Sequence, residues 1–155
     1  MCIRDRFYRD GRARSIGVSN FQPHHLRQLL ADREIIPAVD QIEVNPYLTQ
    51  DEVRGFCAEH QIAVEGWSPL GRGQVLGDPV ITAIARRAAK TPAQVVLRWH
   101  LQRGDIVFPK SITPDRIREN IDVFDFELSA AEVKAISALN RNERTGPDPD
   151  TFDWL

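Results

Sequence analysis

Short runs of hydrophobic residues alternate along this chain with longer stretches in which hydrophobic residues recur every three or four positions. Runs of the first kind predict buried β-strands, and the longer spacing predicts amphipathic α-helices. The order of a strand followed by a helix repeats four times. The predicted strands cover residues 14–18, 38–44, 62–66 and 105–108.

Signals for helix starts follow the predicted strands. Thr49 and Glu52 have the spacing of a capping box, in which each side chain bonds a free backbone N–H at the start of a helix. Leu48 and Val53 flank them as a hydrophobic staple. The other predicted helices begin after Asn20 (with Leu26, Leu29 and Leu30 at helical spacing), at Asp78-Pro79, at Thr91-Pro92 and at a second capping box in residues 129–132.

Strands that alternate with helices pair in parallel through right-handed crossovers, and the helices cover the sheet. This pattern predicts an α/β fold, either a doubly wound sheet or part of a β/α barrel. No G-x-G-x-x-G turn follows a strand, which argues against a Rossmann dinucleotide site. Polar or aromatic residues at successive strand ends favour a barrel, whose functional residues gather at that rim. They are Ser19, Asn20, Gln41, Glu43, Trp67, Ser68, Lys110 and Ser111.

Residues 107–120 predict an anion-binding site where the fourth strand gives way to a helix. Thr113 and Pro114 have the chemistry of an N-cap and a first helical position. A helix N-terminus offers unpaired backbone N–H groups and a partial positive charge, which suit a phosphate. The side chains around it are Lys110, Ser111 and Arg116. A solvated surface with a few charges is the alternative that this spacing leaves open.

The same helix has two predicted faces. Ile112 and Ile117 are spaced as a hydrophobic staple around the N-cap. Ile117, Ile121 and Phe124 form a stripe that we expect to face the core. Arg116, Glu119 and Asn120 share the opposite face.

Composition restricts the class of protein. The 155 residues are 42% hydrophobic and 27% charged, which is typical of one globular domain. A net charge of −2 gives no general attraction to nucleic acid or to an anionic membrane. Cys2 and Cys57 have neither metal-site spacing nor the number for a disulfide framework, which favours the cytoplasm. The sequence contains neither an apolar run of membrane-spanning length nor a signal peptide.

Four strand-end motifs carry a family resemblance: residues 16–21 (IGVSNF), 41–47 (QIEVNPY), 67–71 (WSPLG) and 109–111 (PKS). In this order they resemble the C-terminal half of an aldo-keto reductase over about residues 7–155. Trp67 and residues 146–150 are most similar to the bacterial branch that includes 2,5-diketo-D-gluconate reductases. The resemblance implies an α/β fold that is the C-terminal half, about strands 5 to 8, of a (β/α)8 TIM barrel.

The resemblance also implies an NADPH-dependent oxidoreductase of small aldehydes and ketones. Ser19, Asn20 and Gln41 would hydrogen-bond the nicotinamide carboxamide, a role for side chains that donate and accept. Trp67 would stack on the nicotinamide ring. Ser68, with the backbone near Leu70 and Gly71, would line the pyrophosphate.

The predicted anion site would then hold the adenosine end of NADPH. Lys110, Ser111 and Arg116 would bind the 2′-phosphate, for which a planar guanidinium is well suited. Glu119 and Asn120 would face the adenine.

The proton donor of the family has no counterpart in this sequence. In the family it is a tyrosine tuned by a lysine and an aspartate, with a histidine that orients the substrate, and all four precede the resembling segment. We therefore expect a fragment that contains no catalytic residue and is inactive alone. Its expected parts are a non-native segment (1–6), a partial barrel (7–140) and a C-terminal tail (141–155).

Two alternative functions stay open, a non-catalytic NADPH-binding subunit that senses redox state and a half-barrel that self-associates. The substrate and the oligomeric state are not readable from the sequence. Tyr47 is predicted to be structural, and Phe152 and Trp154 either wall the pocket or pack against a helix. The histidines have no role in the family and are predicted to lie on helix or loop surfaces; they are His24, His25, His60 and His100.

Overall fold

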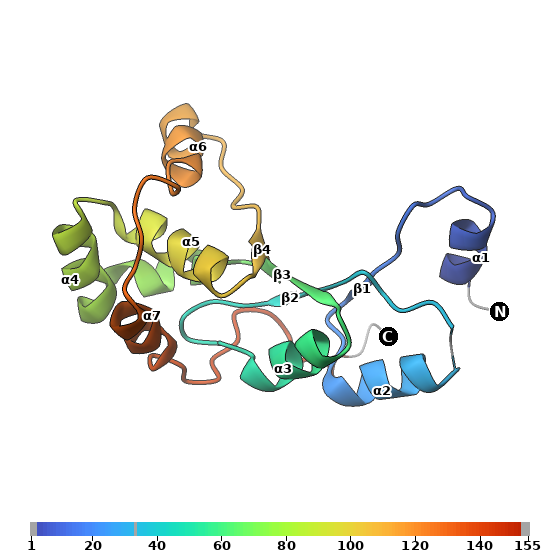
Figure 1. The fold of residues 1–155 in the computed structure, drawn as a ribbon. Coiled ribbons are helices and arrows are strands. Elements are labelled where there is room, and N and C mark those ends of the chain that lie inside the picture. Colours follow the sequence, from blue (N-terminus) through green and yellow to red (C-terminus); the bar gives the residue numbers. More distant parts are fainter. Residues whose placement is uncertain (1–2, 33, 153–155) are drawn as a thin grey trace. The chain divides into compact units, whose positions relative to one another are not determined.

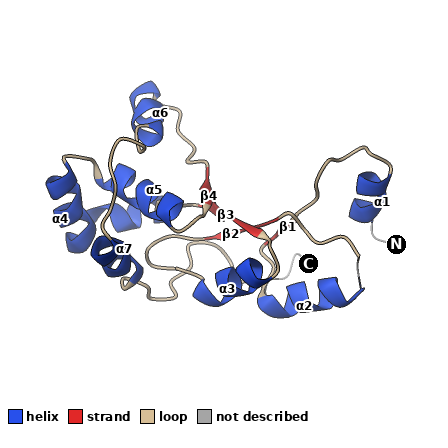
Figure 2. Cartoon of the chain, viewed as in Figure 1, coloured by secondary structure: helices blue, strands red, loops and turns tan. Residues whose placement is uncertain are grey.

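The computed structural model describes residues 3–32 and 34–152, in which helices alternate with short strands (Figures 1 and 2). The strands are β1 (Val18–Ser19), β2 (Val39–Glu43), β3 (Ala63–Trp67) and β4 (Ile106–Val107). The helices are α1 (Ile3–Arg9), α2 (Pro23–Asp32), α3 (Asp51–Glu59), α4 (Pro79–Ala88), α5 (Pro92–Gln102), α6 (Pro114–Ile121) and α7 (Ala130–Ser137), with a 3-10 helix η1 (Gly71–Gly77) after β3. The predicted alternation is confirmed, although β1 is shorter than predicted and η1 was not predicted.

The strands form one sheet in the order β1-β2-β3-β4. β1 pairs with β2 in parallel, and Val18 lies opposite Asp40 while Ser19 lies opposite Gln41. Neighbours in the sheet are therefore neighbours in the chain, as expected when each strand returns through a helix. The predicted α/β fold with a parallel sheet is confirmed.

The chain divides into two compact units. Unit 1 comprises Met1–Ile42, Asp51–Glu65 and Pro147–Leu155, and unit 2 comprises Glu43–Gln50 and Gly66–Gly146. The boundary falls within β2 and β3, so the C-terminal end of each of these strands belongs to unit 2. None of the described helices has the length and apolar character of a membrane-spanning segment.

The core of unit 1 is built from one face each of α2 and α3. Leu26, Val53 and Cys57 are buried there, together with Ile42 of β2. Burial, reinforced by the nearby Asp40 carboxylate, raises the pKa of the Cys57 thiol to about 12. Cys57 is thus a protonated core residue and is not a nucleophile at neutral pH. Cys2 lies outside the described residues.

The core of unit 2 surrounds α5. Val95, Val96, Leu97 and Trp99 are buried, and α4 and α7 pack against this helix. The indole N–H of Trp99 donates to the Ser137 hydroxyl of α7 at 3.0 Å, so the largest buried side chain also has its polar atom paired.

Three of the predicted helix starts have the predicted chemistry. The Asp78 carboxylate accepts a hydrogen bond from the Val80 N–H at 2.9 Å and caps α4. Thr91 forms a complete capping box at the start of α5, and Ser129 forms another at the start of α7. Pro79 and Pro92 each occupy the first turn, as predicted.

The capping box predicted at Thr49 is wrong. Helix α3 begins at Asp51, and Gln50 has a left-handed backbone with φ of 52°. A residue in that conformation cannot be the first residue of a helix, so Thr49 lies outside α3. The flanking Leu48 and Val53 are nevertheless both buried.

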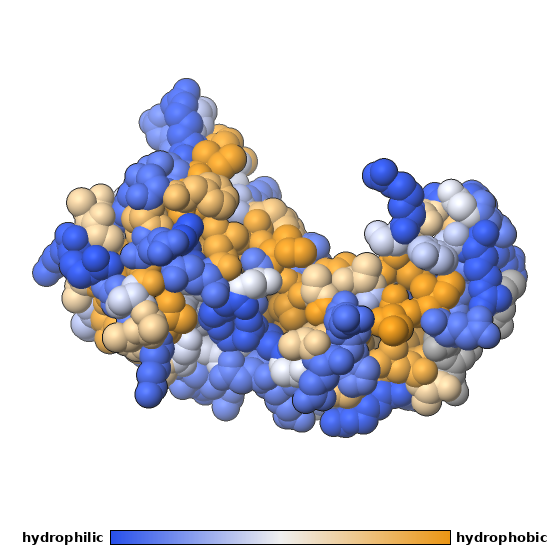
Figure 3. Space-filling model, in the orientation of Figure 1, coloured by the Kyte–Doolittle hydropathy of each residue, from blue (hydrophilic) through white to orange (hydrophobic). Residues whose placement is uncertain are grey.

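The predicted staple and core-facing stripe of α6 are also wrong. Ile112 is 90% exposed and cannot pack on Ile117. Ile117, Ile121 and Phe124 are 53%, 71% and 71% exposed and line an open apolar hollow of about 390 Å³. Figure 3 shows hydrophobic side chains along one side of α6. Ile117 and Ile121 belong to α6 and Phe124 follows it, and all three line the same hollow. Helical spacing alone does not supply a neighbour to cover such side chains.

Candidate functional site

The loop after β3 in unit 2 forms the wall of a pocket with a cavity volume of about 470 Å³. Ser68, Gly71 and Arg72 have φ of 50°, 53° and 53°, so the backbone turns through left-handed conformations where the strand ends. Gly71 is the residue type that adopts this conformation without strain. Trp67, Ser68, Pro69 and Leu70 line the pocket, as do Phe108 and Pro109 after β4.

Cationic side chains meet the aromatic wall in this pocket. Lys110 and Arg116 line it, and both also line an adjacent hollow of about 320 Å³ with Ser111. Within residues 3–32 and 34–152, neither cation forms an ion pair or hydrogen bond. By contrast, Arg118 on the same helix is paired with Asp115 at 2.8 Å. Unpaired cations beside a hollow favour an anionic ligand.

Arg72 is a third cation of this pocket, and sequence reasoning did not identify it. It follows Gly71 and precedes Gly73, and this run is shorter than a G-x-G-x-x-G phosphate-binding turn. The left-handed backbone at Gly71 and Arg72 is the feature that brings the guanidinium to the pocket. A glycine on each side of a lone arginine after a strand was the available sequence signal.

The start of α6 differs in detail from the predicted anion clamp. Thr113 occupies the N-cap position, but its side chain makes no capping hydrogen bond. The Ser111 hydroxyl instead accepts from the Thr113 N–H at 3.2 Å. Because Pro114 is the first helical residue and has no N–H, the free donors of the first turn begin at Asp115.

Glu119 and Asn120 make different contacts from Lys110 and Arg116 and do not line the pocket of Trp67. The Glu119 carboxylate accepts from the Thr91 hydroxyl, a contact that ties α6 to the start of α5. Asn120 lines the apolar hollow beside α6 and not the pocket of Trp67. Their assignment to the adenine stays a prediction.

The polar strand ends of unit 1 are bonded to one another. The Ser19 hydroxyl donates to the backbone carbonyl of Gln41 at 3.0 Å, and the side-chain amide of Asn20 donates to the Ser19 hydroxyl at 3.1 Å. The Gln41 amide donates to the Glu65 carboxylate. Ser19 and Asn20, but not Gln41, line a pocket of about 480 Å³ whose wall includes Phe152 of the tail. Trp154 lies outside the described residues.

Asp40 is a buried carboxylate with few partners. One oxygen accepts from the Phe21 N–H at 3.4 Å, and the other has no hydrogen-bond partner within the described residues. Burial raises the pKa of Asp40 to about 6, against a smaller lowering by the Phe21 N–H. No sequence pattern predicts the properties of this group, because a single aspartate in a strand has no motif.

Glu43, also buried on β2, is surrounded by donors. Its carboxylate accepts from the Thr145 N–H at 2.8 Å, from the Thr145 hydroxyl and from the Gly146 N–H at 3.1 Å. A Cβ at Gly146 would lie 2.5 Å from the Trp67 ring, so the backbone held by Glu43 lies directly against the indole. Glu43 thereby fixes the tail beside Trp67.

Tyr47 is buried and has the structural surroundings that were predicted, whereas His60, predicted to lie on a surface, is half-buried directly after α3. The Tyr47 hydroxyl donates to Asp78 at 3.0 Å. The ring of His60 stacks on Phe56 with centroids 4.1 Å apart. The prediction for His100 is wrong, because this side chain is fully buried between Asp105 and Pro69. A histidine on a helix can be buried when the core offers hydrogen-bond partners for its ring, and the spacing of the sequence does not reveal such partners.

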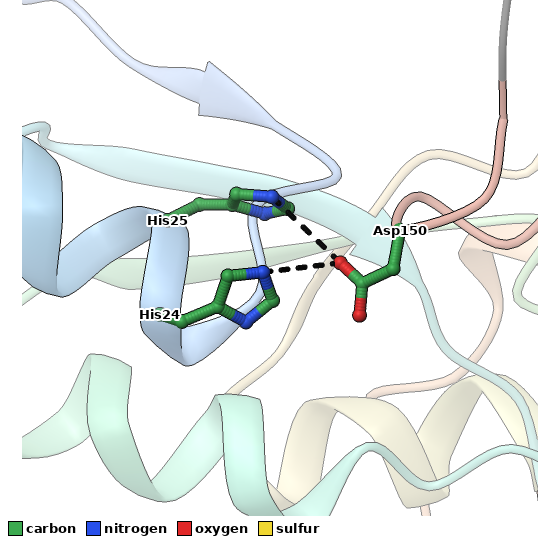
Figure 4. A group of neighbouring side chains, drawn as sticks. All are labelled: His24, His25 and Asp150. Carbon is green, nitrogen blue, oxygen red and sulfur yellow. Dashed lines mark ion pairs between the residues drawn. The ribbon is translucent and has the colours of Figure 1, made fainter.

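His24, His25 and Asp150 form a cluster in unit 1 whose ligand atoms lie within 4.8 Å of one another (Figure 4). The Asp150 carboxylate lies 3.2 Å from Nε2 of His24 and 3.7 Å from Nε2 of His25. However, the Gln22 N–H donates to Nδ1 of His25 at 3.1 Å. Neutral His25 therefore carries its proton on Nε2, which leaves no lone pair there for a metal. The cluster is best described as a polar contact between α2 and the tail.

Comparisons with known proteins agree with the geometry. The profile of the aldo/keto reductase family matches residues 4–141. An aldo-keto reductase of Mycolicibacterium smegmatis is 56% identical over 93% of this chain and 52% of its own length. The glyoxal reductase of Bacillus subtilis is 53% identical over 94% of this chain and 53% of its own length.

A solved structure gives the same result for the fold. The crystal structure of a Gox0644 mutant in complex with NADPH has a TM-score of 0.94 and 46% identity, and covers 97% of this chain and 56% of that one. The chain thus spans about half the length of the relatives it matches.

Proposed function

Because the chain belongs to the aldo/keto reductase family, we propose that it carries the NADPH-binding part of a reductase of small aldehydes and ketones. In this proposal it is the C-terminal half, about strands 5 to 8, of a (β/α)8 barrel. The branch of 2,5-diketo-D-gluconate reductases is part of the same proposal and is supported by Trp67 and residues 146–150. Glyoxal, the substrate in the name of one relative, is a suitable first test compound.

The pocket of unit 2 is the observation that carries this proposal. It combines an indole ring, a hydroxyl and three cationic side chains, contributed by Trp67, Ser68, Arg72, Lys110 and Arg116. An aromatic wall suits a planar ring, and unpaired guanidinium and ammonium groups suit phosphates. A dinucleotide with an additional phosphate offers both kinds of group.

The residues fit particular parts of NADPH. In unit 2, Trp67 would stack on the nicotinamide, Ser68 and the backbone of Leu70 and Gly71 would line the pyrophosphate, and Arg72 would add a positive charge there. Lys110, Ser111 and Arg116 would hold the 2′-phosphate, with Glu119 and Asn120 toward the adenine.

In unit 1, the groups suited to a carboxamide are Ser19, Asn20 and Gln41, which donate and accept in a fixed arrangement. When bound, NADPH supplies a hydride to the carbonyl carbon.

Reduction of a carbonyl also requires a proton on its oxygen. We propose that the donor belongs to the half of the relatives' length that this chain does not match. General acid catalysis contributes about 10²- to 10⁴-fold, so the chain alone would bind NADPH while reducing aldehydes at a small fraction of a reductase's rate.

Isothermal calorimetry of the 155-residue chain with NADPH, NADP⁺ and NADH tests the proposal. We expect binding of NADPH and NADP⁺ and much weaker binding of NADH. Oxidation of NADPH in the presence of glyoxal, followed by absorbance, should be negligible. Equal affinities for NADPH and NADH would contradict the phosphate assignment, and turnover at a rate typical of reductases would contradict the missing donor.

A further inference from the structure

His100 occupies a fully buried position behind the pocket of unit 2. Its Nδ1 lies 3.0 Å from the Asp105 carboxylate, and its Nε2 lies 3.1 Å from the backbone carbonyl of Pro69. The imidazole and the Asp105 side chain are both 0% exposed. The ring also lies against β3, because a Cβ at Gly66 would be 3.8 Å from its Cε1.

Both neighbours of the imidazole are hydrogen-bond acceptors. A carbonyl can only accept, and an ionised carboxylate can only accept. The contact with the Pro69 carbonyl requires a proton on Nε2, and Asp105 contacts the other ring nitrogen in the same buried space. His100 thus donates to Pro69 while Asp105 holds the ring in its orientation.

Pro69 is the residue through which this contact reaches the pocket. In the loop after β3, the Ser68 carbonyl accepts from the Gly71 N–H and the Leu70 carbonyl accepts from the Gly73 N–H, both at 2.8 Å. The carbonyl between them has His100 as its donor. Without that donor a buried carbonyl would lose its partner, and the loop would favour another conformation that hydrates it.

We infer that His100 is a positioning residue for the NADPH pocket, acting through Pro69 on the loop that carries Trp67 and Ser68. This inference rests on the proposed function for its consequence in cofactor binding. Its structural part, the control of the loop by His100, is independent of any ligand. Nothing in the resemblance to reductases assigned a role to this histidine.

Two double variants of the full chain isolate the hydrogen bond to Pro69. His100→Gln with Asp105→Asn keeps a donor that reaches the Pro69 carbonyl, and His100→Met with Asp105→Asn has a similar shape without a donor. Asp105→Asn in both removes the buried charge that either change at position 100 would leave unpaired. His60→Gln, in unit 1, controls for the loss of a histidine that contacts a backbone carbonyl.

Hydrogen exchange in residues 67–73, measured without ligand, is the first readout. We expect the variant with His100→Met, called the Met-containing variant, to exchange about tenfold faster than the wild type in this segment, a loss of about 1.4 kcal/mol of local protection. The variant with His100→Gln, called the Gln-containing variant, should stay near the wild type. Equal exchange in the two double variants overturns the inference. If the Met-containing variant does not fold, the Gln-containing variant is compared with the wild type alone, and faster exchange in it overturns the inference.

The affinity for NADPH, measured by calorimetry, is the second readout. We expect it to fall about tenfold in the Met-containing variant and to be restored in the Gln-containing variant. A wild-type chain that does not bind NADPH overturns the proposed function and leaves the exchange result to decide the role of His100. If the wild type binds NADPH but both double variants bind it with the same affinity, the role of His100 in positioning the loop for binding is overturned.

Discussion

The two units treat their polar groups in opposite ways. In unit 1 the strand-end residues Ser19 and Asn20 are hydrogen-bonded to one another, while the buried Asp40 has one long hydrogen bond and an oxygen without a partner in the described chain. In unit 2 the buried Glu43 has three donors, while the exposed Lys110 and Arg116 have no ion pair in the described chain.

The difference separates groups that hold the fold from groups that are available to a ligand. A buried carboxylate with three donors fixes the backbone around it. An exposed cation without a partner costs little to maintain and is ready for an anion. Unit 2 therefore has the rigid wall and the free charge of an anion-binding site, and unit 1 offers neutral hydrogen-bonding groups that are already oriented.

The largest expected effect concerns the donors around Glu43. Glu43→Gln retains the shape of the side chain but places an amide N–H₂ against a backbone N–H. Charge-assisted hydrogen bonds are lost, and we expect the free energy of unfolding to fall by about 2 to 4 kcal/mol, measured by urea denaturation. Glu143→Gln, on the exposed part of the same tail, should change it by less than about 0.5 kcal/mol. Similar small changes in both variants would mean that Glu43 does not hold the tail.

The free cations of unit 2 give the next effect. Arg116→Ala should weaken binding of NADPH by about 1.5 to 3 kcal/mol, as expected when a hydrogen bond to a charged group is lost, and leave NADH nearly unchanged. Calorimetry with both cofactors measures this difference. Arg118→Ala is the matched control, because Arg118 lies on the same helix and is paired with Asp115. An equal loss for both cofactors would refute the assignment of Arg116 to the 2′-phosphate.

Asp40 gives an effect of opposite sign. Its pKa in the folded chain, about 6, lies above the ordinary value of 3.8, so the folded state binds the proton more tightly than the unfolded state. Asp40 therefore costs nothing at a pH below about 4, and its cost grows as the pH rises toward about 6, above which it is complete. Asp40→Asn should stabilise the chain by about 1 to 3 kcal/mol near neutral pH and by nothing at the acidic end.

Denaturation of the Asp40→Asn variant at several pH values measures this profile, and the acidic end is its internal control. A variant that is less stable than the wild type near neutral pH would show that the carboxylate has donors which outweigh its burial.

The smallest expected effect tests a feature that depends on local sequence alone. The Ser129 hydroxyl accepts from the Glu132 N–H at 3.3 Å and caps α7. Ser129→Ala should lower the free energy of unfolding by about 1 kcal/mol, and Ser129→Gly by only a few tenths. Thermal denaturation followed by circular dichroism measures both. A loss as large as that of Glu43→Gln would mean that local capping matters as much to unit 2 as its buried carboxylate.

Local sequence patterns predicted the elements better than they predicted their surroundings. The caps at Asp78, Thr91 and Ser129 were correct because a cap involves only residues within one turn of each other. Thr49 has the same spacing, but the positive φ of Gln50 delays the helix. That backbone conformation has no signal in the residues themselves.

The candidate site shows the same division. Lys110 and Arg116 were predicted from their spacing, and the structure brings them into one pocket with Trp67 and Ser68. Arg72 was missed because its place in the pocket depends on the left-handed backbone at Gly71 and Arg72, and His100 was missed because its partners come from other segments of the fold. His100 reaches Pro69, 31 residues away in sequence, and no periodicity links the two.

The sequence by itself determined the alternation of strands and helices, the parallel α/β class, and the residue types at the strand ends, because each depends on periodicity or on neighbours within one turn. Only the tertiary structure decided which polar groups are satisfied and which are free. Burial and hydrogen-bond partners come from segments far apart in the chain, as with Glu43 and Thr145, 102 residues apart. For that reason the two carboxylates of β2 differ. Asp40 has few hydrogen-bond donors, whereas Glu43 has three and holds the backbone of Thr145 and Gly146.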